Sequence, residues 1–561
     1  MKFLGRLLLT ILLLLVLVLV IVYVFIQTRW AAGSISRWVT DNSEYRLSID
    51  AISHSWSSPS RLTLSGVKFA EKNQPDVLDA KEVDLDLSWA QITEPHTFDR
   101  VVLVNGNLNL SPQTLNLPLK ANTLQLSNIA LSGALEQWKV DGKNVNAGIS
   151  PWQPTANAVL GNNAQFQLSA DTLSLDDIPA TNVLIQGRID NRQLMLGNFG
   201  ADLARGQLTG KASRSADGDW TLDNLRLSNV RLQSAQPLET FWQEFIKLPK
   251  VDIKRLDLID ARLQGQNWSV SDLDLTVTDV TLQKGDWQSA DGQLSLNATD
   301  MINGNLHFID PNLNLDLSPQ GVAIRQFGTR WEGGLLRASG NWTRASRNLE
   351  LDQLSVAALE YTLPENWRQL WLDTLPDWLS DVSVTKFTAN RNLIIDISPD
   401  SPFQITGLDG FGTQLKLARD HQWGIWSGKL NLNASDATFI RNDVRRPSLA
   451  LEASDDAITI TELSAFTKEG LLEATAKVSQ QPQRDFSVSL TGRAVPANEL
   501  QNWGWSALPI EGNANMQLTL KGQMPAHVDF RPTLNGSLRA TGNEGKEIHQ
   551  QINNGVVSEA P

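Results

Sequence analysis

A short pattern of apolar residues recurs along this chain and limits the folds open to it. The stretch LDLIDARLQG (256–265) has two apolar residues two positions apart, then a step of three positions, then two more apolar residues two positions apart. The same or closely related patterns occur in LTLSGVKF (62–69), VVLVNGNLNL (101–110), LQLSNIALSG (124–133) and LRLSNVRLQS (225–234). The step contains Asn, Asp or Gly each time, and these residues favour turns and bulges.

The step of three positions has a physical consequence in a β-strand. Alternate residues of a regular strand point to one face, so the leucines before the step and those after it would point to opposite faces. A β-bulge at Ile259–Asp260 would add one residue, return the second pair to the first face and sharpen the twist. A tight corner between two short strands would do the same, and the pattern does not separate these alternatives. The leucines expected to line the shared apolar face are Leu124, Leu126, Leu131, Leu225, Leu227, Leu232, Leu256, Leu258 and Leu263.

The body of the chain is predicted to be mainly β. From about residue 45 onward, apolar residues alternate with Asn, Asp, Ser, Thr or Gln, as in WSVSDLDLTVTDVTLQ (268–283) and SGKLNLNASDATF (427–439). This alternation is typical of strands with one apolar and one solvated face, and Gly, Pro and Asn-Gly signals separate them. Such a sheet must hide its apolar face in a dry sandwich or barrel, or keep it as an open trough that carries an apolar ligand.

The N-terminal segment is predicted to cross a membrane. The run from Leu7 to Ile26 contains 20 residues, of which only Thr10 and Tyr23 carry a hydroxyl. At about 1.5 Å per residue it spans roughly 30 Å, the thickness of a bilayer core. The apolar region of a cleaved signal peptide is usually about 7–15 residues long. We therefore expect a retained transmembrane helix over residues 7–27.

The expected topology has the N-terminus in the cytoplasm. Lys2 and Arg6 precede the apolar run and Arg29 and Arg37 follow it, so the positive charges on its two sides are nearly balanced and the rest of the chain decides the orientation. The rest of the chain shows no second span, has no cysteine and is rich in strand patterns. We therefore expect a bacterial inner-membrane protein with a single span, whose residues 28–540 lie in the periplasm.

A few segments are predicted to be helical or unstructured. Short helices are expected at 29–42, 237–248, 364–380 and 496–505, where apolar residues recur at helical spacing and would cap the sheet. The first of these follows the span, so its Trp30 and Trp38 are predicted to lie at the membrane interface. Residues 541–561 lose the alternation and are predicted to be a flexible, solvated tail.

Composition and motifs argue against several function classes. The formal charge is −13 and no run of Lys or Arg occurs, which disfavours a nucleic-acid partner. The absence of cysteine excludes disulfides, Cys-ligated zinc and thiol chemistry. The 6 histidines are scattered, and no phosphate-binding loop or nucleophile elbow occurs. We therefore expect no catalytic residues, no metal and no cofactor.

Several segments resemble the AsmA-like family. The similarity is carried by the N-terminal span followed by QTRWAAGSISRWVTDNSEYRLSID (27–50) and PSRLTLSGVKF (59–69), and by VPANELQNWGWSALPIEGNANMQLTLKGQ (495–523). It covers nearly the whole chain except the tail. The resemblance implies an inner-membrane anchor, a periplasmic body and an extended, curved, taco-like β-groove akin to that of bridge-like lipid transfer proteins.

The resemblance also implies a function without implying catalytic residues. Larger members of the family are implicated in moving phospholipid toward the outer membrane, and AsmA itself in outer-membrane protein assembly. The expected partners are therefore phospholipid, the inner membrane and outer-membrane assembly factors. The leading hypothesis is a groove that holds or conducts lipid. The alternative is a scaffold that assists outer-membrane protein assembly through its sheet edges by strand addition.

The predicted span has a direct test. N-terminal sequencing of the mature protein is expected to find Met1 or Lys2, because an uninterrupted apolar run of this length is retained as an anchor. A new terminus near Gly33 would show instead that the segment is a cleaved signal peptide.

Overall fold

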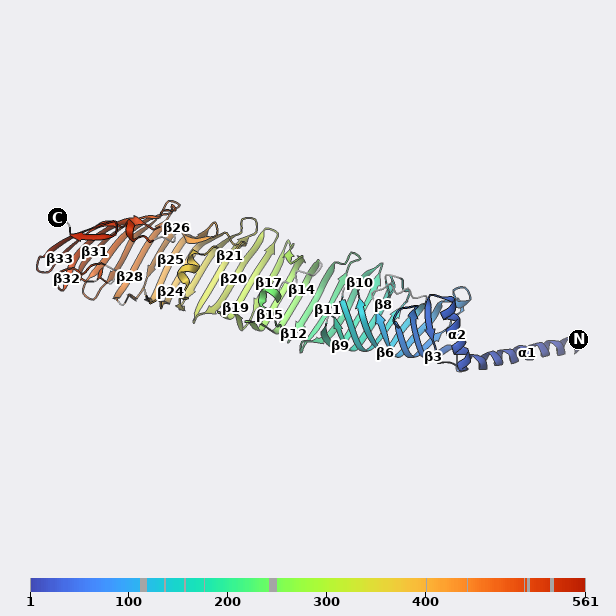
Figure 1. The fold of residues 1–561 in the computed structure, drawn as a ribbon. Helices are drawn as coiled ribbons and strands as arrows, with labels where there is room; N and C mark the ends of the chain where they lie inside the picture. Colours follow the sequence, from blue (N-terminus) through green and yellow to red (C-terminus); the bar gives the residue numbers. More distant parts are fainter. Residues whose placement is uncertain are drawn as a thin grey trace. The chain divides into compact units, whose positions relative to one another are not determined.

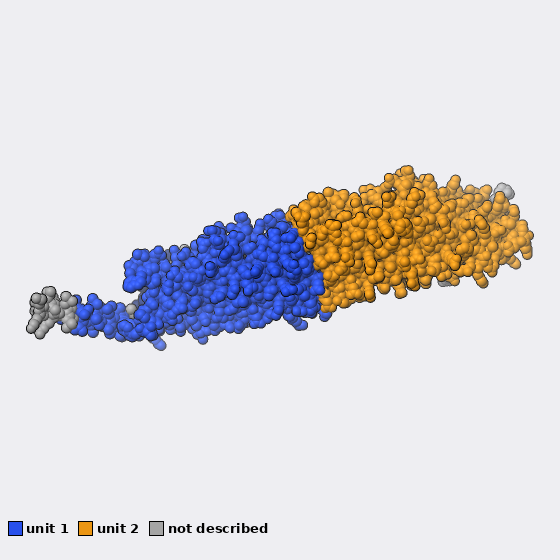
Figure 2. Space-filling view, turned by 180° about the vertical axis from the view of Figure 1, so that it is seen from behind, with its two compact units in different colours: residues 1–266, 274–286 blue, residues 267–273, 287–561 orange. Residues whose placement is uncertain are grey.

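The structure is a computed structural model, and it divides into two compact units (Figure 2). Unit 1 contains residues 1–266 and 274–286, and unit 2 contains residues 267–273 and 287–561. The structure describes residues 2–110, 119–135, 138–155, 158–175, 177–241, 250–399, 401–440, 442–498, 500–501, 505–524 and 529–559. Both units consist mainly of β-strands, as the alternating sequence predicts.

Two helices precede the first strand. Helix α1 (Lys2–Ile26) consists mostly of Leu, Val and Ile and contains no Pro. Helix α2 (Arg29–Asn42) begins where the Thr28 side chain accepts a hydrogen bond from Ala31 N. No single helix in the described part of the chain is long and apolar enough to cross a membrane. The segments Thr10–Phe25 and Arg29–Asn42 meet those criteria only as a pair, bent by 78°.

Unit 1 is a sheet whose strands lie side by side in chain order (Figure 1). Neighbouring strands are antiparallel except at two places: β5 pairs with β6 in parallel, and β12 and β13 both pair with β14 in parallel. The strands are β1 (Tyr45–Ser48), β2 (Ala51–Ser55), β3 (Ser58–Glu71), β4 (Leu78–Asp86), β5 (Thr97–Leu110), β6 (Lys120–Leu135), β7 (Trp138–Ser150), β8 (Ala164–Leu175), β9 (Ile178–Asp190), β10 (Gln193–Leu203), β11 (Gly206–Arg214), β12 (Trp220–Ser228), β13 (Arg231–Gln233) and β14 (Val251–Gly265); the 3-10 turn η1 (Trp89–Ile92) follows β4.

Unit 2 repeats this plan, and strand β15 (Trp268–Gln283) is divided between the units, with residues 268–273 in unit 2 and residues 274–283 in unit 1. Its strands are again mostly antiparallel, and β22 and β23 both pair with β24 in parallel. The remaining elements are β15 (Trp268–Gln283), β16 (Asp286–Trp287), β17 (Gly292–Asn297), β18 (Asp300–Asn303), β19 (Leu306–Ser318), β20 (Gly321–Trp331), β21 (Gly334–Thr343), β22 (Asn348–Ala357), β23 (Glu360–Thr362), α4 (Trp367–Leu372), β24 (Asp381–Asp396), β25 (Phe403–Arg419), β26 (Gln422–Asn433), β27 (Asp436–Phe439), β28 (Asn442–Ala453), β29 (Ala457–Phe466), β30 (Leu471–Ser479), β31 (Asp485–Pro496), β32 (Asn513–Gln523), η3 (Arg531–Thr533), β33 (Asn535–Gly542), β34 (Glu547–Asn553) and β35 (Val556–Glu559).

The repeated sequence step coincides with a left-handed backbone residue. The φ angles are 62° at Gly66, 53° at Asn105, 53° at Asn128, 57° at Asn229 and 47° at Asp260. Both alternatives predicted from the sequence occur. Strands β6 and β14 continue through the left-handed residue, whereas a corner at Asn229 separates β12 from β13. Asn, Asp and Gly suit these positions because they tolerate φ > 0 better than other residues.

The left-handed residues are aligned across each parallel pair, and in the second strand of each pair a side chain accepts a hydrogen bond from the backbone N–H of the left-handed residue. The register places Asn105 beside Asn128 and Asn229 beside Asp260. A backbone N–H at a bulge lies outside the regular ladder and needs another acceptor. In all three parallel joints a carboxylate or amide of the next strand accepts it: Asn128 N donates to Asn146 Oδ1 (3.0 Å), Asp260 N to Asp274 Oδ1 (2.9 Å) and Arg391 N to Asp409 Oδ1 (2.7 Å).

The buried apolar residues gather in separate clusters along the strands. In unit 1 the largest cluster contains the fully buried Ile129 and Val145. Unit 2 has one cluster around Val384 and Leu415 and another around Met516 and Leu538. Each cluster lies on the face to which the alternating apolar residues point, so the sequence pattern correctly identifies the core face.

Two local predictions are wrong. Residues 547–559 form β34 and β35, although 541–561 were predicted to be a flexible tail, because pairing with β33 buries Ile548 and Ile552. The helix predicted over 364–380 ends at Leu372, and Pro376 disfavours helical backbone at the residue before it.

Of the helix predicted at 237–248, residues 238–241 are helical and 242–248 lie outside the described residues. The prediction at 496–505 also falls partly outside them.

The left-handed conformation can be tested at Asn229, whose side chain is exposed. Asn229→Val is expected to reduce the free energy of unfolding by about 1–2 kcal/mol, because a β-branched residue is strained at positive φ. Asn229→Gly is the matched control and should be neutral to within about 0.5 kcal/mol. Urea unfolding of the detergent-solubilised full-length protein, with hydrogen exchange of β12–β14, measures both. Equal stability of the two variants would contradict the assigned role.

Candidate functional site

Three of the predicted groove-lining leucines are part of a dry core. Leu124, Leu126 and Leu131 of β6 are buried together with Ile129, which follows the left-handed Asn128. The bulge therefore returns the second apolar pair to the face of the first pair, as predicted. At β6 this face is covered by neighbouring side chains and offers no open surface.

The other six predicted leucines form a paired row that is only partly covered. Strands β12 and β13 run beside β14 in register, and all six leucines are partly exposed. The register places Leu225 beside Leu256, Leu227 beside Leu258 and Leu232 beside Leu263. We call these six residues the leucine ladder. The structure therefore brings together residues that lie about 30 positions apart in the sequence, and it leaves them accessible.

The leucine ladder can bind apolar ligands but offers no polar selectivity. Each methylene group of a ligand that moves from water onto such a surface contributes up to about 0.8 kcal/mol of favourable binding free energy. Paired leucines on adjacent strands give a continuous strip, which fits a long flexible hydrocarbon better than a compact ring system. The strip is interrupted only by the fully buried Ala261 and the buried Val230, both apolar.

A large cavity in unit 1 does not coincide with the ladder. Its volume is about 940 Å³, and it is lined mainly by the polar strand face, including Gln125, Gln167, Gln186 and Arg188. None of the nine predicted leucines lines it. The cavity is therefore a solvated depression and not an apolar pocket.

Helix α2 presents the two predicted interface tryptophans to the outside. The side chains of Trp30 and Trp38 are 64% and 68% exposed, whereas Ala31 and Ala32 are buried. Ala32 packs in a small cluster with Ile49 and Ile52. The helix thus contacts the first strands through small residues and turns its tryptophans away from them.

In unit 2 the connection between β23 and β24 is fixed by one buried carboxylate. The Asp396 side chain is 1% exposed and accepts hydrogen bonds from Trp367 Nε1 (3.2 Å) and Arg368 Nη2 (3.1 Å) of α4. Burial disfavours the charged form of Asp396. Hydrogen bonds from Ser398 and Trp367, together with the positive charge of Arg368, outweigh this effect and hold the pKa of Asp396 below its ordinary value. The exposed face of α4 carries Trp371, which stacks on Trp423.

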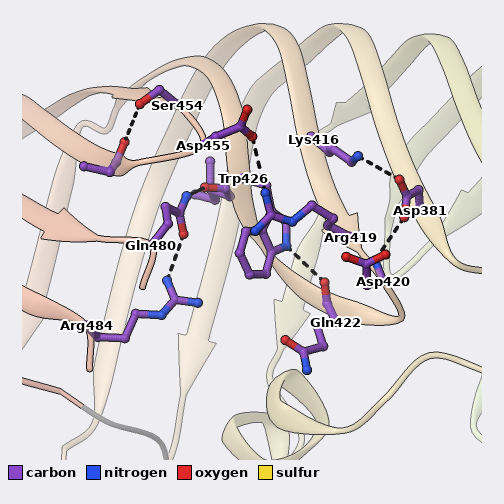
Figure 3. A network of polar contacts seen from close by, with 12 residues as sticks. Asp381, Lys416, Arg419, Asp420, Gln422, Trp426, Ser454, Asp455, Gln480 and Arg484 are labelled. Atoms are coloured by element: carbon purple, nitrogen blue, oxygen red, sulfur yellow. Dashed lines mark hydrogen bonds and ion pairs between the residues drawn. The ribbon is translucent and has the colours of Figure 1, made fainter. Parts of the chain in front are cut away.

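A second polar network joins β25, β26 and the turn after β30 (Figure 3). The guanidinium groups of Arg419 and Arg484 lie 4.0 Å and 5.4 Å from the ring centre of Trp426. Burial and the charge of Arg419 lower the pKa of Arg484. Arg484 donates to Gln480 Oε1 and Arg419 donates to Asp455 Oδ1, so both guanidinium groups are hydrogen-bonded within the protein. The two arginines therefore serve to hold neighbouring strands together.

Four carboxyl groups among the described residues have a lowered pKa, and each is held within the fold. In the described part of the chain, no group of three His, Asp or Glu side chains is placed to hold a metal ion. The carboxyl groups with lowered pKa are each paired with a basic residue of the chain: Asp86 with Arg61 and Arg100, Asp257 with Arg255, Asp381 with Lys416, and Asp396 with Arg368. Ion pairing within the fold explains these shifts.

Comparison with known proteins gives one strong match. The chain is 52% identical over 558 residues to the AsmA family protein YicH of Escherichia coli (strain K12), and the alignment covers 100% of this chain and 98% of that protein. No family model matches the chain. The N-terminal apolar helix and this relative are both consistent with a membrane-anchored protein.

The Asp396 contact predicts a pH-dependent attachment of α4. Because its folded-state pKa is depressed, Asp396 contributes stability above the ordinary carboxyl range near pH 4, and this contribution is lost as the pH falls through the depressed pKa. Asp396→Asn should cost about 1–3 kcal/mol at neutral pH and accelerate hydrogen exchange of α4. The difference from wild type should vanish in acid. The exposed Asp373→Asn is the control, and an equal effect there would contradict the assignment.

Proposed function

The chain belongs to the AsmA family, and from that premise we propose that it is a membrane-anchored protein that binds lipid acyl chains on its apolar strand face. The observation that carries the proposal is the leucine ladder. The left-handed residues Asn229 and Asp260 keep its two halves on one face, yet none of the described parts of the chain fully covers it. An acyl chain is apolar and long, and would supply the missing cover.

The transport role follows from the same surface. A strip without hydrogen-bonding groups holds hydrocarbon without a deep energy minimum at one point, so a lipid can move along it. We infer that the protein contributes to phospholipid transfer between the inner and outer membranes and to outer-membrane homeostasis. The curved groove that would enclose the acyl chains is part of this proposal, as is the absence of an enzymatic activity.

The proposed location places the strands in the periplasm. Helix α1 would cross the inner membrane with its N-terminus in the cytoplasm, and residues 28–559 would lie on the other side. From Thr10 to Phe25 every side chain except Tyr23 is exposed, so the apolar surface of α1 has little contact with the strands. A bilayer would remove this surface from water.

A second function is favoured by the end of the sheet. In the described part of the chain, β35 pairs with β34 only, so its other edge is open. Val556 on this short strand is exposed. An open edge can accept a strand from another protein, and the alternative function is therefore a scaffold that assists or regulates outer-membrane protein assembly.

The lipid proposal predicts that stability and binding respond differently at two positions. Leu126→Asp places a charge in the dry core and should reduce the free energy of unfolding by about 3–5 kcal/mol. Leu258→Asp lies on the accessible ladder and should cost less than about 1.5 kcal/mol, while crosslinking to a photoactivatable phospholipid falls about tenfold. Thermal unfolding and crosslinking of the full-length protein measure the two effects.

The control is Gln264→Asp, which introduces the same charge at an exposed position of β14. It should leave both stability and crosslinking unchanged. A collapse of stability in Leu258→Asp would mean that the ladder is part of a filled interior and would favour the scaffold.

A further inference from the structure

The last turn of α1 is fixed to the hairpin between β2 and β3. Tyr23 Oη and Gln27 Nε2 both donate to the backbone carbonyl of His54, at 3.0 Å and 3.2 Å. The Tyr23 ring also lies 4.7 Å from the ring of Trp56, at the hairpin tip. The tip therefore lies beside the C-terminal end of α1, where a membrane-spanning helix would leave the hydrocarbon.

Two turns at this end of the sheet expose large apolar side chains. Trp56 is 72% exposed, and in η1 Trp89 is 88% and Ile92 76% exposed. Leu87 N donates to Ser60 O (2.7 Å), so the two turns leave neighbouring strands at the same end. Tryptophan is usually largely buried in soluble domains, and so much exposure at adjacent turns indicates an interaction surface.

The electrostatic character of these segments fits a lipid surface. The whole chain carries a net charge of −13, yet HSWSSPS (54–60) and LSWAQIT (87–93) contain no Asp, Glu, Lys or Arg. Helix α2 adds Arg29 and Arg37 near its start and middle and one acid, Asp41, in its last turn. The nearby Asp86 is paired with two arginines. Anionic headgroups would therefore meet no carboxylate in the two turns themselves.

The bend between the helices completes the geometry. Helix α2 makes an angle of 78° with α1, so it would lie nearly in the membrane plane if α1 crosses the bilayer. Its exposed Trp30 and Trp38 then lie at the depth where tryptophan is enriched. The β2–β3 tip is attached to the same point on α1, which places Trp56 near that depth.

We propose that the hairpin tip 54–60 and the turn 87–93 are a membrane-docking surface of the folded body, distinct from the span. Trp56, Trp89 and Ile92 enter the headgroup region of the leaflet at the C-terminal end of α1, beside α2. This inference rests on the anchoring part of the proposed function. Leu85 and Phe98, at the same end of β4 and β5, pack on the apolar cluster of unit 1, so the apolar strand face begins at the docked end.

The absence of cysteine allows each position to be labelled uniquely. Single variants Ser57→Cys and Ala90→Cys of the full-length protein carry an environment-sensitive fluorophore after reconstitution into phosphatidylethanolamine–phosphatidylglycerol vesicles. Spin-labelled lipids then report proximity to the bilayer by quenching. Thr28→Cys reports the end of the span, and Ala216→Cys, in an exposed turn between β11 and β12, is the negative control.

Labels at 57 and 90 should be quenched about threefold more strongly than the label at 216, and as strongly as the label at 28. Replacing Trp56 and Trp89 by Ser in the 90-labelled protein should remove most of the difference. Quenching at 28 without quenching at 57 and 90 would overturn the docking surface and leave the anchor in place. A failure to quench at 28 as well would overturn both the docking surface and the proposed anchor.

Discussion

The left-handed residue at the bend of each strand is the constraint on which the apolar face depends. Without it, the step of three positions would place half of the leucines of β6 or β14 on the solvated face. The bend leaves a backbone N–H outside the ladder, and Asn146, Asp274 or Asp409 of the next strand accepts it. At these three bends the neighbouring strand therefore supplies the acceptor that the regular ladder lacks. Local backbone geometry and side-chain placement are thus coupled along the sheet.

This coupling produces two kinds of surface from the same repeated sequence. At β6 the aligned leucines are covered and form a core. At β12–β14 the same arrangement remains partly open. The difference lies in the neighbouring strands, because β7 and β8 add Val145, Ile149 and Ala170 to the cluster at β6. In the proposed function, the covered region provides stability and the open region binds lipid.

Much of the fold follows from the sequence, because alternation and turn residues act locally. The bends at Asn128, Asn229 and Asp260 carry residues that favour them, and their positions were predicted. The bends at Ala358 and Arg391 were not predicted, because neither residue favours positive φ. There Leu359 N donates to Asn392 Oδ1 and Arg391 N donates to Asp409 Oδ1, and both acceptors lie elsewhere in the sequence. The final strands escaped prediction for a related reason, because β34 buries Gln550 between two isoleucines and so lacks an apolar run.

The candidate site was predictable only in part. The leucines were identified, but their spacing does not indicate which of them neighbouring strands cover. Trp56 and Trp89 stand alone in polar turns, and only the contact of Tyr23 with His54 and the register of β3 with β4 bring them to one end of the sheet. Long-range pairing of this kind is not encoded in a local pattern.

In the proposed function, an acyl chain covers the leucine ladder. Mass spectrometry of lipids that co-purify with the full-length protein, compared with the Leu258→Asp variant in the same detergent, tests it most directly. If an acyl chain covers the ladder, phospholipid is expected in at least stoichiometric amount on the wild-type protein and in a much smaller amount on the variant. Equal lipid content in the two proteins, or a wild-type protein without bound lipid, would contradict it.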